Sequence, residues 1–302
     1  MLVFVLGATG GIGQMLLPEL VQHGHQVLAL ARSDASAAKI KTLGADVVHG
    51  DLSDARLLSD SASRADAVIN LAFDASSQAG MVEAAMQEAR AIETLGAALV
   101  GTQKPLLVSN GALTYAFSGS AGLIDEDSPW PVGGEMNPRA SGLKAAQALA
   151  ARDVFVATFF FPPSCHRAGE TGLIPILMDH ARKNGFVPYV GDGSQRWPAT
   201  HLQDIATLLR LLIEAPAGQR PWMNKLHPIA EGGVAWKDIS TAIGQALDLP
   251  TRSVSAQDAT DLFGFVGRLI NIDVPVSSTQ TKAAFQWQPK GPSLCQDIEQ
   301  NY

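Results

Sequence analysis

The stretch VFVLGATGGIGQMLLPEL, residues 3–20, decides the fold. A short apolar run leads directly into Gly7, Gly10 and Gly13, and a segment with helical apolar spacing follows them. In a dinucleotide-binding turn the first glycine permits the tight turn, the second lets the backbone approach a pyrophosphate, and the third lets the helix pack closely on the strand. The helix N-terminus then offers N–H groups and the positive end of its dipole to the phosphates. The alternative, a glycine-rich turn that binds nothing, is the weaker interpretation because further strand patterns follow downstream.

Alternating apolar and amphipathic segments continue from this turn as far as residue 161. Strands are predicted at 2–6, 26–31, 46–49, 67–72, 105–109 and 153–161. Helices are predicted near 11–23, 34–43, 54–60, 76–100 and 138–152. Continuous apolar strands that alternate with helices are typical of βαβ units, whose parallel strands are covered on both faces. The sequence therefore predicts an α/β protein with a Rossmann-type, doubly wound parallel sheet.

The alternation becomes less regular after Pro162 and Pro163. Further helices are predicted at 171–183, 203–214 and 235–247, and a further strand at 186–190. We therefore expect a cofactor-binding Rossmann domain over residues 1–161, with returning elements near 191–230. A smaller C-terminal substrate-binding lobe over residues 162–302 is expected to be interleaved with them.

Composition limits the kinds of partner. A formal net charge of −7 over 302 residues offers no basic stripe to phosphates, so a nucleic acid partner is not expected. Cys165 and Cys295 are the two cysteines and the histidines are scattered, so neither a disulfide framework nor a metal site is expected. The six apolar residues before Gly7 are too few for a signal peptide, and no apolar run is long enough to span a bilayer. The expectation is a cytoplasmic protein that acts on a small molecule.

Residues after the second and third predicted strands bear on which nicotinamide cofactor binds. Arg32 and Ser33 directly follow the second strand. NAD-specific domains place an acid near this point for the ribose 2′-hydroxyl, whereas NADP-specific domains place an arginine for the 2′-phosphate. The sequence therefore predicts NADP in preference to NAD, with an ordinary surface arginine as the alternative. Asp51 either reaches the adenine amino group or caps the helix from residue 54, with Ser53 as the rival cap.

Several motifs resemble those of one enzyme family. They are GATGGIG (7–13), GDL (50–52), NLA (70–72), LLVSNGALTY (106–115), DEDSPWP (125–131), FFPPSCH (160–166) and GDGSQRWPATHLQDIA (191–206). Their order resembles the extended short-chain dehydrogenase/reductases, also called the NAD-dependent epimerase/dehydratase family. Within that family, RWPATHLQD (196–204) and PVSSTQTKAAFQWQP (275–289) resemble an atypical microbial branch. The resemblance implies cofactor contacts at Gly7, Thr9, Gly10, Gly11, Ile12, Gly13, Arg32, Ser33, Asp51, Leu52, Leu71, Ala72, Phe73, Ser109, Lys144 and Pro162.

The chain departs from this family at the residues that carry out proton transfer. Family reductases carry a Tyr-x-x-x-Lys pair on the helix after the acidic loop, and a serine or threonine after the fifth strand. The tyrosine exchanges a proton with the substrate oxygen, the lysine lowers its pKa and holds the ribose, and the hydroxyl polarises the carbonyl. Here Ala140 stands four residues before Lys144, and the hydroxyl position falls on Gly111. Lys144 either holds the nicotinamide ribose or is a solvent-facing lysine.

By the same resemblance, seven residues line the cleft where the nicotinamide meets the substrate: Phe73, Asn110, Tyr115, Trp130, Pro162, Ser164 and His166. Phe73 and Trp130 have a core role as their alternative, and His166 has the role of a satisfied loop histidine. Tyr115, on the loop that leaves the fifth strand, is the favoured substitute proton donor, followed by His166. The Asn110 amide is a neutral donor that stabilises an oxyanion.

The leading hypothesis is an NADP(H)-dependent oxidoreductase that acts on a small or medium carbonyl or alcohol compound. The alternative is an NADP-binding sensor or regulatory protein with little turnover, and a sugar-nucleotide epimerase or dehydratase ranks last because it needs the missing tyrosine. The helices at 76–100 and 138–152 resemble those that pair family members into dimers. The second is alanine-rich, which permits close helix approach, so the sequence predicts a homodimer. Packing of the two helices within a monomer is the alternative.

Overall fold

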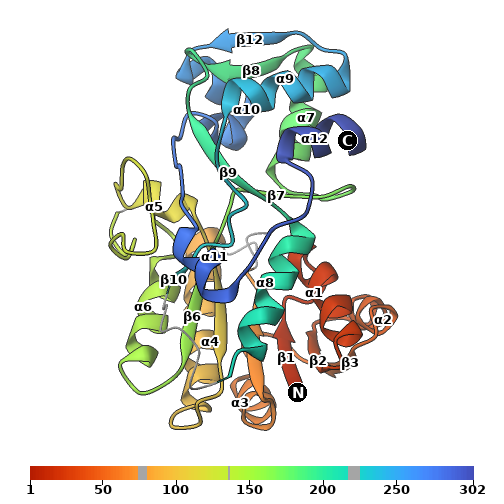
Figure 1. The fold of residues 1–302 in the computed structure, drawn as a ribbon, viewed down its shortest axis with the longest axis vertical. Helices are drawn as coiled ribbons and strands as arrows, with labels where there is room; N and C mark the ends of the chain where they lie inside the picture. Colours follow the sequence, from red (N-terminus) through yellow and green to blue (C-terminus); the bar gives the residue numbers. More distant parts are fainter. Residues whose placement is uncertain (74–79, 135–136, 217–224) are drawn as a thin grey trace.

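The computed structural model describes residues 1–73, 80–134, 137–216 and 225–302. Within these ranges the chain forms a seven-stranded parallel sheet in the order β10-β6-β5-β4-β1-β2-β3 (Figure 1). Its strands are β1 (Leu2–Leu6), β2 (Gln26–Ala31), β3 (Asp46–His49), β4 (Ala67–Asn70), β5 (Leu106–Gly111), β6 (Val156–Phe161) and β10 (Lys225–Leu226). The predicted Rossmann-type parallel sheet is confirmed.

Helices cover both faces of this sheet because its strands are apolar on both faces. Along β1, Val3 and Val5 pack into one core and Phe4 and Leu6 into the core on the opposite face. The first face is covered by α1 (Gly11–Gln22), α2 (Asp34–Thr42) and α8 (Leu202–Glu214). The second face is covered by α3 (Ala55–Arg64), α4 (Gly80–Ala97) and α6 (Ala140–Ala150).

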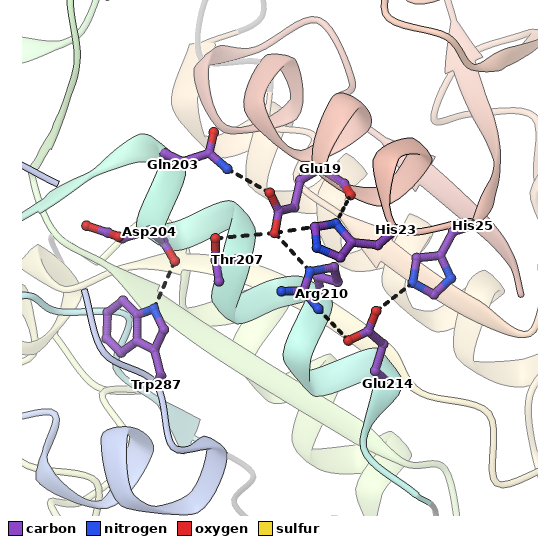
Figure 2. A network of polar contacts seen from close by, with 9 residues as sticks. All are labelled: Glu19, His23, His25, Gln203, Asp204, Thr207, Arg210, Glu214 and Trp287. Atoms are coloured by element: carbon purple, nitrogen blue, oxygen red, sulfur yellow. Dashed lines mark hydrogen bonds and ion pairs between the residues drawn. The ribbon is translucent and has the colours of Figure 1, made fainter. Parts of the chain in front are cut away.

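A polar network joins α1 to α8 (Figure 2). The buried carboxylate of Glu19 on α1 accepts hydrogen bonds from Gln203 Nε2 at 2.8 Å, Thr207 Oγ1 at 3.3 Å and Arg210 Nε at 2.8 Å. Arg210 also pairs with Glu214 at 2.5 Å. The helix that follows the glycine turn is thereby fixed to an element nearly two hundred residues later in the chain.

A third core is built mostly by residues outside the Rossmann layers, many of them on elements drawn in the upper half of Figure 1. Trp197 and Trp236 lie at its centre, with their rings edge to face and their centroids 4.8 Å apart. Two small sheets contribute, in the orders β11-β9-β7 and β12-β8. The strands are β7 (Ser164–His166), β8 (Val187–Val190), β9 (Arg196–His201), β11 (Glu231–Ala235) and β12 (Thr251–Val254). The helices outside the Rossmann layers are α5 (Leu113–Phe117), α7 (Leu173–Asn184), α9 (Trp236–Leu247), α10 (Ala256–Leu269), α11 (Thr279–Phe285) and α12 (Leu294–Asn301).

Several boundaries differ from the sequence prediction for local reasons. The fourth strand ends at Asn70, and the sixth begins at Val156 after Asp153 adopts a left-handed backbone with φ of 59°. The predicted helix 76–100 is α4, Gly80–Ala97, and residues 76–79 lie outside the described ranges. Neither Asp51 nor Ser53 caps the third helix, because Asp54 accepts the Leu57 N–H at 3.0 Å and is the N-cap.

Among the described residues, no helix is both long enough and apolar enough to cross a membrane.

Candidate functional site

A continuous trough runs along the carboxyl edge of the large sheet. In the strand order, β1 and β4 are neighbours whose connections leave in opposite directions, and such switch points are where open α/β sheets bind ligands. Gly7 leaves β1 there, and the segment from Leu71 to Phe73 leaves β4. Three adjoining hollows of about 340, 260 and 230 Å³ share Leu71 as a lining residue. We call these joined hollows the trough.

The middle of the trough is the glycine turn, whose backbone leaves no room for side chains. Gly7 has φ of 78°, and a Cβ on it would lie 2.7 Å from the Ala72 nitrogen. A Cβ on Gly13 would lie 2.5 Å from the Ala8 oxygen. Gly10 is the N-cap of α1, no side chain caps the helix, and its first turn holds no acidic residue. The first amides of α1 therefore face the trough with no side-chain cap and no acidic residue in their own turn, which fits a dinucleotide pyrophosphate.

One end of the trough is lined by polar residues suited to an adenosine ribose. Arg32, Ser36 and Asp51 line it together with Leu30 and other apolar residues. The Asp51 carboxylate accepts hydrogen bonds from the Ser53 N–H at 2.7 Å and the Ser53 hydroxyl at 2.5 Å. These two bonds hold the pKa of Asp51 below its usual value, and the positive charge of Arg32 lowers it further. The end therefore carries a fixed carboxylate and a guanidinium close together.

The opposite end of the trough is lined by Phe73, Asn110, Gly111, Arg139 and Pro162, among other residues. The Arg139 guanidinium lies over the Phe73 ring, with Cζ 4.2 Å from the ring centroid. Its Nη2 donates to the Ser109 carbonyl oxygen at 2.7 Å. Asn110 uses its Oδ1 to accept from the Gly111 N–H at 2.8 Å. The sequence prediction missed Arg139, although it stands directly before Ala140, the position that lacks the family tyrosine.

Residues from beyond β6 form a wall of the trough opposite the glycine turn. Cys165, Glu170, Thr171 and Gly172 line the same hollow as Gly10. Glu170 accepts a hydrogen bond from the C-terminal Tyr302 hydroxyl at 3.1 Å, and burial raises the pKa of Glu170. The sequence prediction did not include this wall, because Glu170, Thr171 and Gly172 belong to none of the recognised motifs.

Most of the residues predicted to hold the cofactor are brought together at the trough. They are Gly7, Thr9, Gly10, Gly11, Ile12, Gly13, Arg32, Asp51, Leu52, Leu71, Ala72, Phe73, Ser109 and Pro162. Ser33 is not among the lining residues, and its hydroxyl caps α2 by accepting the Ser36 N–H at 3.2 Å. Lys144 is an exposed residue of α6 that lines none of the three hollows.

The two favoured proton donors are not brought to the trough. Tyr115 lies in the short helix α5, not on a loop, and is fully buried with its hydroxyl 3.0 Å from His227 Nε2. Burial raises the pKa of Tyr115. His166 is fully buried on β7 with its Nδ1 2.7 Å from the Asp297 carboxylate, and burial lowers the pKa of His166. Neither side chain lines the three hollows.

Two predicted substrate residues also lie elsewhere. Trp130 lines a separate hollow of about 370 Å³ beside α6 that shares no lining residue with the trough. Ser164 is buried on β7, and its hydroxyl has no hydrogen-bond partner among the described residues. Phe73 and Asn110 are the predicted substrate-side residues that line the trough in addition to Pro162.

Known proteins match this fold and this glycine turn. A family model described as NAD(P)H-binding matches residues 7–122. An uncharacterised protein of Saccharomyces cerevisiae is 36% identical over 308 residues, covering 100% of this chain and 99% of its own. The 2-alkyl-3-oxoalkanoate reductase of Stenotrophomonas maltophilia is 28% identical over 249 residues, covering 77% of this chain and 71% of its own.

A solved structure shows the same architecture at low sequence identity. The dTDP-glucose 4,6-dehydratase of Bacillus anthracis in complex with NAD superposes with a TM-score of 0.75, covers 100% of this chain and 95% of its own, and is 15% identical. That likeness is one of fold. Residues 7–122 thus form an NAD(P)H-binding domain on a Rossmann-type fold. The chain belongs to one family with the uncharacterised Saccharomyces cerevisiae protein.

Proposed function

We propose that the protein is an NADP(H)-dependent oxidoreductase that acts on a small or medium carbonyl or alcohol compound. The observation that carries this proposal is the trough itself. A guanidinium, Arg32, lines one end, the glycine turn lies in the middle, and polar donors on Asn110 and Arg139 line the other end.

Each part of the trough has a defined role in this proposal. Arg32 binds the 2′-phosphate that distinguishes NADP from NAD, because a guanidinium matches phosphate geometry. Gly10 and the first turn of α1 hold the pyrophosphate, and Phe73 and Pro162 hold the nicotinamide end. The nicotinamide supplies or accepts a hydride there. The name of the bacterial relative, a 2-alkyl-3-oxoalkanoate reductase, supports a carbonyl group as the reacting centre.

A second candidate function, an NADP-binding sensor or regulatory protein, has one observation in its favour. Neither Tyr115 nor His166 lines the trough, and Lys144 is exposed outside it. A protein that binds the cofactor without this proton-transfer machinery would turn over slowly or not at all. The two candidates share the cofactor and differ in turnover.

The cofactor assignment is tested with Arg32→Ala. A hydrogen bond to a charged group contributes roughly 1.5–3 kcal/mol, so this change should weaken NADPH binding by about ten- to a hundredfold and leave NADH binding unchanged. Calorimetric titration of both cofactors measures this. Arg56→Ala removes an arginine on α3 whose side chain is 94% exposed, and serves as the control.

A wild-type protein that prefers NADH would refute the role of Arg32. The two functions are then separated by following NADPH oxidation with a panel of aldehydes, ketones and quinones. Turnover with any member supports the oxidoreductase. Tight NADPH binding with no turnover on the whole panel supports the sensor.

A further inference from the structure

The guanidinium of Arg139 is held rigidly at the trough end where Asn110 and Gly111 lie. Its Nε donates to Glu88 Oε2 at 3.3 Å, its Nη2 donates to Glu88 Oε1, and Nη2 also donates to the Ser109 carbonyl. The side chain of Glu88 is 1% exposed and that of Arg139 is 18% exposed. Glu88 therefore anchors the guanidinium from the buried side, and Arg139 is one of the residues that line the trough.

One N–H donor group of the Arg139 guanidinium, Nη1, is not used by the ion pair. Nε and Nη2 make all the hydrogen bonds recorded for this guanidinium among the described residues, so Nη1 has none there. A buried ion pair that only stabilised the fold would have no reason to line a cavity. A buried pair is also weak evidence for stability, because desolvation offsets most of its attraction.

Neither Gly111 nor Ala140, the two positions where the family carries its catalytic hydroxyl groups, supplies one here. A Cβ built on Gly111 meets nothing within 4 Å, so the space beside it is open. Ala140 carries a methyl group where the resemblance places a tyrosine. Asn110 Oδ1 already accepts from the Gly111 N–H and from the Thr114 hydroxyl at 2.6 Å. Arg139 is therefore the charged donor at this end of the trough among the described lining residues.

We propose that Arg139 binds the oxygen of the substrate carbonyl and stabilises the negative charge that develops on it, and this inference rests on the proposed oxidoreductase function. During reduction the carbonyl carbon gains the hydride and the C=O π pair moves onto oxygen. A proton from water then completes the hydroxyl group. Arg139 keeps its own protons, because a guanidinium remains charged throughout the ordinary pH range.

The ion pair between Glu88 and Arg139 also indicates which class of substrate would bind at this end of the trough. Because Glu88 neutralises Arg139, the pair carries no net charge and is a poor trap for a free anion. It presents a directed N–H to one oxygen, as the donors of an oxyanion hole do. The geometry therefore favours an uncharged ketone or aldehyde group at this point.

The test uses variants that avoid an unpaired buried charge. In the double variant Arg139→Gln/Glu88→Gln both partners become neutral amides. In Arg139→Lys the positive charge is kept, but the planar set of guanidinium N–H donors is lost. Arg152→Gln, an exposed arginine just beyond α6, is the control. Removal of an oxyanion donor costs about 10²–10³ in kcat, so we expect that loss in the double variant with KM within about threefold. NADPH affinity by calorimetry should stay within about twofold of wild type.

A second readout needs no turnover. In protein labelled with ¹⁵N-arginine, the Nε resonance of Arg139 is identified by its disappearance in Arg139→Lys. Acetophenone titrated into the complex with NADP⁺, or into the free protein should NADP⁺ not bind, should shift this resonance in wild type and in Arg152→Gln.

The outcomes separate the two proposals. Wild type that binds NADPH but reduces no carbonyl compound overturns the oxidoreductase function, and the Arg139 resonance then decides the present inference alone. A resonance that acetophenone does not move overturns the inference. Turnover within tenfold of wild type in the double variant also overturns it, while the oxidoreductase function stands. Should the double variant fail to fold, a kcat in Arg139→Lys equal to that of wild type overturns the inference in its place.

Discussion

Replacement of Glu19 tests how much the contact between α1 and α8 stabilises the fold. Glu19→Leu removes the carboxylate that accepts from Gln203, Thr207 and Arg210 (Figure 2). The side chains of Glu19 and Arg210 are 9% and 14% exposed, so the ion pair is largely buried. Breaking such a pair by removing one partner costs about 3–5 kcal/mol. We expect about 3 kcal/mol, the lower end, because Arg210 keeps its pair with Glu214.

This loss should be visible by two measurements. Urea denaturation should give a free energy of unfolding about 3 kcal/mol lower. Unfolding entropy is about 2.1 cal/mol/K per residue, which over 302 residues converts that loss to a fall in Tm of about 5 °C. Glu83→Gln is the control, because its ion pair with Arg90 joins side chains that are 51% and 61% exposed. An exposed pair of this kind contributes about 0–1 kcal/mol.

A double variant separates the lost pair from the lost packing. In Glu19→Leu/Arg210→Met the guanidinium is no longer left without its buried partner, so the loss should be smaller than the sum of the two single losses. A coupling of about 0.5–3 kcal/mol is expected for groups in one network. Additive losses, or a Glu19→Leu loss below about 1 kcal/mol, would refute the reasoning.

Two further predictions concern pH and assembly. His227 is fully buried and burial lowers its pKa, so below its unfolded pKa of about 6.5 the unfolded chain takes up a proton that the folded chain resists. The difference in free energy of unfolding between wild type and His227→Asn should therefore decrease as the pH falls from 7.5 to 5.5. The decrease is at most about 1.4 kcal/mol per pH unit. Urea unfolding at both pH values measures this difference, and a difference that stays constant contradicts the prediction. We also propose a homodimer that contacts through α4 and α6; on α4, Met81, Val82 and Met86 are 38%, 69% and 47% exposed. A monomeric mass by light scattering at micromolar concentration contradicts this proposal.

The large sheet could be predicted from the sequence because its signals are local. The apolar run of β1, the glycine turn and the start of α1 are consecutive, and their order alone specifies a βα unit. The small strands were missed because β7 and β10 span three and two residues, too few to show a period. Helix α10 contains a kink at Gly264, which interrupts the periodicity that identifies a helix.

The residues of the candidate site also fall into two groups: those that local sequence predicts and those whose position depends on contacts far along the chain. Residues that line the trough follow directly after strand ends, so the presence of Gly7, Arg32 and Asp51 there could be predicted. The position of Tyr115 depends on His227, which lies 112 residues away, and no local pattern reports that contact. A tyrosine close in sequence to the expected hydroxyl position was therefore assigned to the cleft, whereas packing with Phe160 and His227 places it in the core.

Arg139 shows that a site can carry a polar group suited to the substrate even where a residue typical of the family is absent. Neither Ala140 nor Gly111 carries a hydroxyl group. Arg139 is the N-cap of α6, directly before the first helical residue. A long side chain at that position reaches both Glu88 and the trough. In the mechanism that we propose, Ala140 and Arg139 are two parts of one arrangement, in which stabilisation of the substrate oxygen by a guanidinium takes the place of proton donation by a side chain.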